Sequence, residues 1–178
     1  MKDGTDAFTA REYDKSARLF LQVGMADPDN IDAWLAYAIA RFASGDYGMS
    51  ADAIRRGVGR YPDVVNSPFD LRERYGNPDD FSKHLTALRE FVLDNNGNAD
   101  GWVVLGFVRH FAGERRQAAR TFETVKQRFE SDDGLADIFL KAKSPGDQSA
   151  TPPAETSPSS TQAPPPTPTD EDDAPDSP

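Results

Sequence analysis

Two stretches of the sequence share one pattern. Residues 34–45 read WLAYAIARFASG, and residues 102–113 read WVVLGFVRHFAG. Each stretch begins with Trp and ends with Gly, so both the Trp pair and the Gly pair are separated by 68 residues. Apolar residues recur at spacings of three and four, which is typical of a helix with a buried face, and the closing Gly permits a tight turn. The two stretches therefore predict two equivalent helices, each followed by a turn.

The separation of 68 is twice 34, and a 34-residue frame fits much of the chain. The columns of the frame agree in character in most units, but the middle unit has Pro68 in the column that holds Trp elsewhere. Small residues recur at Ser16, Ser50 and Ala118, where they would let paired helices approach closely. The frame gives a partial unit at 3–30, units at 31–64, 65–98 and 99–132, and a capping helix at 133–142.

Residues 144–178 have a different composition. They contain ten of the 14 Pro and seven acidic residues, but no Val, Ile, Leu, Met, aromatic residue, Lys or Arg. A segment without large apolar side chains cannot bury a core of its own. We therefore predict a folded repeat domain at 1–143 and a disordered, Pro-rich acidic tail at 144–178.

Composition also bears on partners and compartment. All 20 Lys and Arg and 23 of the 30 Asp and Glu lie in residues 1–143, which gives that part a net charge of −3. Nucleic-acid binding requires clustered Lys and Arg, so this charge disfavours it. No apolar run is long enough for membrane insertion, and the first residues do not form a signal peptide. As written, the chain is expected to be cytoplasmic, and without Cys it has no disulfide or thiol chemistry.

The units resemble the tetratricopeptide repeat, in which a WxxLG helix is followed by an AxxxF helix and a closing Pro. The matching positions are Trp102, Leu105, Gly106, Ala118, Phe122, Pro28 and Pro62. The resemblance covers residues 3–142. It implies an all-α fold, a right-handed α-α solenoid of helix pairs. It also implies a non-catalytic scaffold for protein–protein interaction that needs no cofactor.

The same resemblance implies where a partner binds. In the family, the first helix of each pair lines a concave groove, and here those places are mostly apolar. We expect them to form an exposed strip that holds a peptide or helix of a partner protein, unless other chain of the same protein fills the groove. The implied groove residues are Leu35, Ile39, Phe42, Phe69, Glu73, Val103, Phe107, His110 and Phe111.

The sequence is compatible with two other functions. The stretch at 75–78 and the apolar residues after it resemble units of bacterial proteins in which such repeats follow an exported amino-terminal region. This implies a structural or assembly segment of a larger, exported or periplasmic protein. A hydrolase or transferase would instead need a pocket that joins His110 to a carboxylate such as Glu73. Since the chain has only two His and no Cys, we expect no catalytic residue.

Local signals add three expectations. Thr9 with Glu12 predicts a capping box, and Asn77 with Pro78 predicts another helix start. Acidic pairs such as the one at 132–133 are expected to complement helix amino termini rather than to bind a metal. Basic pairs such as the one at 55–56 are expected on a solvated face.

Overall fold

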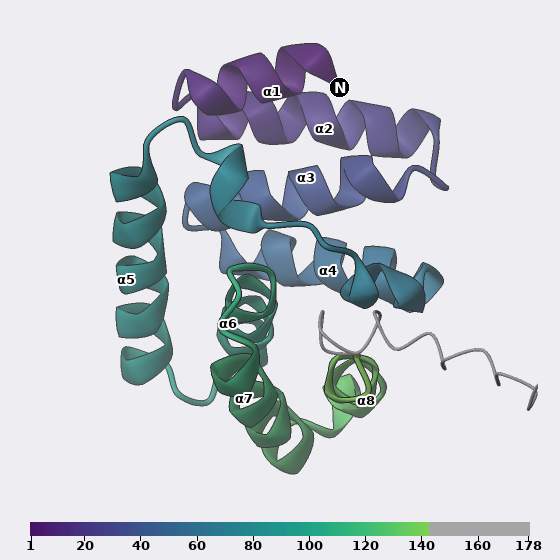
Figure 1. Cartoon of the computed structure of the whole chain (residues 1–178), viewed down its shortest axis with the longest axis vertical. Helices are drawn as coiled ribbons and strands as arrows, with labels where there is room; N and C mark the ends of the chain where they lie inside the picture. Colours follow the sequence, from purple (N-terminus) through teal and green to yellow (C-terminus); the bar gives the residue numbers. More distant parts are fainter. Residues whose placement is uncertain (143–178) are drawn as a thin grey trace, which may run out of the picture.

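The computed structural model of the chain describes residues 1–142 (Figure 1). These residues form α-helices and short 3-10 helices, with no strand among them, so the predicted all-α class is confirmed. The predicted tail at 144–178 lies outside the described residues. The α-helices are α1 (Lys2–Thr9), α2 (Tyr13–Ala26), α3 (Ile31–Ala43), α4 (Tyr47–Arg60), α5 (Pro78–Asp94), α6 (Ala99–Phe111), α7 (Arg115–Arg128) and α8 (Asp133–Leu140). The 3-10 helices are η1 (Pro62–Asn66), η2 (Leu71–Arg74) and η3 (Glu130–Asp132).

Helices α1 to α4 form two hairpin pairs that stack in chain order, as Figure 1 shows. Equivalent serines join the helices within each pair. The Ser16 hydroxyl donates to the Gly4 carbonyl at 2.8 Å, and the Ser50 hydroxyl donates to the Ala38 carbonyl at 2.9 Å. Both serines are fully buried. The column of small residues therefore does two things: it permits close approach of the helices, and it satisfies a buried carbonyl.

The two Trp residues make equivalent hydrogen bonds. Trp34 Nε1 donates to the Pro28 carbonyl at 3.1 Å, and Trp102 Nε1 donates to the Asn96 carbonyl at 2.9 Å. Trp34 is buried, whereas Trp102 is only half-buried at the edge of the core. The hydrogen bonds follow the 68-residue separation, but burial depends on what packs around each indole.

The turns inside three helix pairs share one backbone conformation. Gly45 and Gly113 have φ angles of 80° and 81°, and the corresponding position in the first pair is Arg11 with φ 64°. This left-handed conformation is disfavoured for a residue with a Cβ. Arg11 also forms an ion pair of 2.7 Å with Asp80, whose side chain is 12% exposed. The turn position therefore carries a contact between the first helix pair and α5.

Of the two helix starts predicted from capping residues, the one at Asn77 is confirmed and the one at Thr9 is not. Asn77 accepts a hydrogen bond from the Asp79 backbone N–H, as predicted for the start of α5. The capping box predicted for Thr9 and Glu12 is wrong, because Thr9 is the last residue of α1 and its hydroxyl donates to the Thr5 carbonyl. Helix α2 still begins at Tyr13, without a side-chain cap.

The middle unit lacks its first helix. Residues 62–77 form η1, an extended stretch and η2 in its place. Pro68 has no N–H for a helix and holds the preceding residue extended, and Ser67 has φ −66° and ψ 148°. As a result α6 packs directly against α4. Helix α5 runs crosswise along one side of the stack, beside the ends of α3 and α4 (Figure 1).

Candidate partner-binding site

Residues 62–77 pass back along the stack and cover much of the expected groove. The Val65 carbonyl accepts a hydrogen bond from His110 Nε2 at 2.8 Å and one from Arg115 Nη1 at 3.2 Å. Val65 and Leu71 are 2% and 0% exposed, so this connection belongs to the core. The chain thus places its own backbone where the resemblance puts a partner segment.

Helix α8 covers the rest of α6. The Phe139 ring stacks on the Phe122 ring with centroids 4.2 Å apart, and it meets the His110 ring edge-on at 4.9 Å. Phe107 and Phe111 also lie within 6.5 Å of Phe139, centroid to centroid. The capping helix therefore buries the α6 face that was expected to line a groove.

The structure separates the expected groove residues into buried and open sets. On α6, four of them are 0–3% exposed: Val103, Phe107, His110 and Phe111. Phe42 is also buried, with its ring against His84, and Glu73 is exposed on η2. Leu35 and Ile39 are also largely buried, at 7% and 4% exposed, and Phe69 is half-buried, but these three line an open pocket. The expectation of one continuous exposed strip is therefore wrong, because residues 62–77 and α8 cover its α6 portion.

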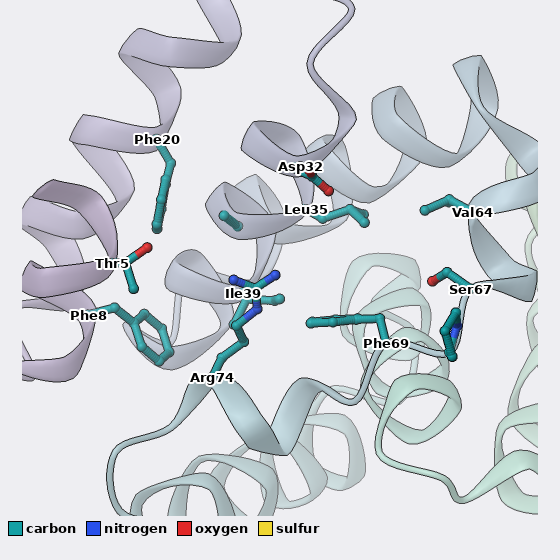
Figure 2. A pocket seen from close by; sticks show the side chains of 12 residues that line it. Thr5, Phe8, Phe20, Asp32, Leu35, Ile39, Val64, Ser67, Phe69 and Arg74 are labelled. Atoms are coloured by element: carbon teal, nitrogen blue, oxygen red, sulfur yellow. The ribbon is translucent and has the colours of Figure 1, made fainter. Parts of the chain in front are cut away.

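The open pocket lies between α1, α3 and the stretch that links η1 to η2, and we call it the α1–α3 pocket (Figure 2). Its volume is about 350 Å³. The apolar residues that line it are Phe8, Phe20, Leu35, Ala36, Ile39, Val64, Pro68 and Phe69. The polar residues that line it are Thr5, Asp32, Ser67 and Arg74. The pocket thus offers a mainly apolar wall with a few polar groups, which is the usual character of a binding site.

Sequence reasoning missed the α1 side of this pocket. Thr5 and Phe8 lie 34 residues before Ile39 and Phe42, two of the expected groove residues. Extending the same columns back into the partial unit at 3–30 would have found them. Nothing in the repeat columns points to Arg74, because it lies in the stretch that departs from the repeat.

The structure does not bring together His110 and Glu73, the pair that a hydrolase or transferase was expected to need. His110 is 3% exposed and bonded to a backbone carbonyl, whereas Glu73 is exposed. His84 Nδ1 lies 3.1 Å from the Tyr75 hydroxyl inside an aromatic cluster. Within residues 1–142, no group of three or more His, Asp or Glu side chains is arranged to hold a metal ion. The described helices also include none long and apolar enough to cross a membrane.

His110 makes the stability of this arrangement depend on pH. Burial lowers its pKa to about 4, although the hydrogen bond to Val65 acts in the opposite direction. An unfolded chain would titrate His110 near its ordinary pKa of 6.5. Between those values the unfolded state binds more protons, so the stabilising effect is complete above pH 6.5 and is lost as the pH falls to about 4.

We expect His110→Gln to weaken this dependence. The unfolding free energy of the wild type should fall by about 3 kcal/mol more than that of the variant between pH 6.5 and 4. Denaturant melts at several pH values measure the difference, and the carboxylates titrate equally in both proteins. Identical pH slopes for the two proteins would contradict the buried position of His110.

Comparisons with known proteins assign no family to this chain. No protein-family model matches the sequence, and no curated protein matches it. Among solved structures, the chain is similar to one described as the crystal structure of MamA. The identity is 20%, the similarity covers 79% of this chain and 90% of that chain, and the TM-score is 0.36. A likeness of this degree assigns no function, and the all-α class rests on the helices described above.

Proposed function

We propose that this chain is a non-catalytic protein-interaction scaffold that binds a short segment of a partner protein in the α1–α3 pocket. The observation that supports the proposal is an apolar pocket of about 350 Å³ that the described residues leave open. Burying one large apolar side chain there would contribute about 1.5–3 kcal/mol. An apolar anchor residue of a peptide or helix is the group that such a wall recognises.

The arrangement of the pocket favours binding over catalysis. Both histidines of the chain are engaged elsewhere, one with a backbone carbonyl and the other with a Tyr hydroxyl. The polar residues of the pocket are Thr5, Asp32, Ser67 and Arg74. This set lacks a nucleophile paired with a general base, which group transfer would require.

Ala36→Arg tests the proposal. Ala36 is half-buried on α3 and lines the pocket, so a long charged side chain there would occupy the space without removing a core residue. Phage-displayed random peptides selected on the wild type should be enriched in sequences with a large apolar residue. We expect these peptides to bind Ala36→Arg at least about tenfold more weakly, a loss of roughly 1.4 kcal/mol.

Ala119→Arg is the matched control. Ala119 is likewise half-buried on a helix, but it lies on α7 and does not line the pocket. This variant should retain wild-type affinity, and both variants should keep the helical circular dichroism spectrum. The proposal would be wrong if selection enriched no peptide, or if the enriched peptides bound equally well to Ala36→Arg.

A further inference from the structure

Arg74 brings a positive charge to the α1–α3 pocket. Figure 2 shows its side chain extending from η2 toward Ile39, between Phe8 and Phe69. The guanidinium carbon lies 5.0 Å from the centroid of the Phe69 ring. Stacking on an aromatic face restrains a guanidinium and leaves its N–H groups directed to the sides. The pocket therefore holds an oriented set of hydrogen-bond donors beside an apolar wall.

This charge has no acidic partner among residues 1–142. Its neighbour Arg72 forms an ion pair of 2.6 Å with Asp70, but within the described residues no ion pair or hydrogen bond engages the Arg74 guanidinium. Asp32 enters the pocket from the opposite side (Figure 2), and the part of the chain that the structure describes gives it no ion pair either. An acidic group is favoured near Arg74 because opposite charges attract, and it is disfavoured near Asp32 because like charges repel.

The chain's own tail does not suit this combination. Residues 144–178 include seven acids, but no Val, Ile, Leu, Met or aromatic residue that could fill the apolar part. A ligand that satisfies both features must join a large apolar side chain to a carboxylate. That combination points to a segment of another protein.

We propose that the α1–α3 pocket recognises a peptide of a partner protein in which a large apolar residue is directly followed or preceded by Asp or Glu, with the carboxylate paired to Arg74. This inference rests on the proposed function and adds the chemical class of the partner. The apolar side chain contacts Leu35 and Ile39, and the carboxylate accepts hydrogen bonds from the guanidinium. Asp32 sets the direction in which the peptide lies.

The test uses two fluorescein-labelled pools of hexapeptides, each with blocked termini so that only side chains carry charge. Both pools have Leu or Phe at the third position; one has Asp at the fourth position and the other has Lys. Fluorescence anisotropy with the full chain should show roughly fivefold tighter binding of the acidic pool, the size expected of an exposed ion pair. Arg74→Gln should remove this preference, and Arg74→Glu should reverse it.

Arg116→Glu is the control, since Arg116 is an exposed residue of α7 outside the pocket. It should keep the wild-type preference for the acidic pool. Equal binding of both pools to the wild type, with loss of both in Ala36→Arg, would overturn the assignment of Arg74 but preserve the proposed function. If neither pool bound to the wild type, both the assignment of Arg74 and the proposed function would be overturned. Sedimentation that shows self-association, with its loss in Ala36→Arg, would identify a second copy as the occupant and would also overturn the inference.

Discussion

Phe107→Asp is expected to abolish the cooperative fold. Phe107 is 1% exposed, its ring centroid lies 5.0 Å from that of Phe111, and Phe139 covers the same face. The substitution removes a buried aromatic side chain, at a cost of about 3–5 kcal/mol, and places an unpaired carboxylate in its cavity. Since domains of this size are stable by only about 5–15 kcal/mol, we expect loss of the helical circular dichroism signal or a strongly reduced melting temperature.

Leu93→Asp provides the comparison. Leu93 lies near the end of α5 and is 76% exposed, so the same new charge should change stability by no more than about 0.5 kcal/mol. A Phe107→Asp protein that folded as well as Leu93→Asp would show that the α6 face is open. In that case the position of residues 62–77 and α8 over α6 would be wrong, and the continuous groove would have to be reconsidered.

Arg55→Ala is expected to destabilise the protein by about 3 kcal/mol, because it leaves a buried carboxylate without its partner. Arg55 on α4 donates through Nε and Nη2 to the two carboxylate oxygens of Asp132, at 2.7 and 3.1 Å. It also forms a 2.8 Å ion pair with Asp100 at the start of α6. The Asp132 side chain is 1% exposed, so water cannot replace the lost donors. Thermal or denaturant unfolding measures the change.

The neighbouring Arg56 is the matched control. It is exposed, its guanidinium carbon lies 5.8 Å from the Trp34 ring, and Arg56→Ala should cost no more than about 1 kcal/mol. A double-mutant cycle between Arg55→Ala and Asp132→Ala should show a large coupling energy, because each substitution removes the same contact. Additive effects in that cycle would mean that the two side chains do not interact in solution.

Local features of the fold were predictable from the sequence. The Trp hydrogen bonds, the Ser hydroxyl hydrogen bonds and the left-handed turns all recur at equivalent positions of the 34-residue frame. The hydrogen bonds join residues at most 12 positions apart. Such contacts depend on helix geometry and side-chain type within one unit, so a column of a repeat is sufficient to predict them. Pro68 in the Trp column likewise marked the unit in which the first helix is missing.

The pocket could be predicted only in part. Leu35, Ile39 and Phe69 were among the expected groove residues, and all three line the pocket. The same columns also selected Phe107 and His110, which are buried. A helical face with apolar residues looks the same in a sequence whether a partner or the chain itself covers it, because periodicity reports only that the face avoids water.

Long-range packing decided the rest. The basic pair at 55–56 was expected on a solvated face, and the acidic pair at 132–133 was expected to serve a helix start. The tertiary structure instead joins Arg55 to Asp132 across 77 residues, and it brings the Val65 carbonyl to His110 across 45. The sequence alone determined helix pairs and their period, since these depend on neighbours along the chain. Only the tertiary structure decided which of the expected groove residues line an open pocket, because the path of residues 62–77 and the position of α8 depend on contacts between distant units.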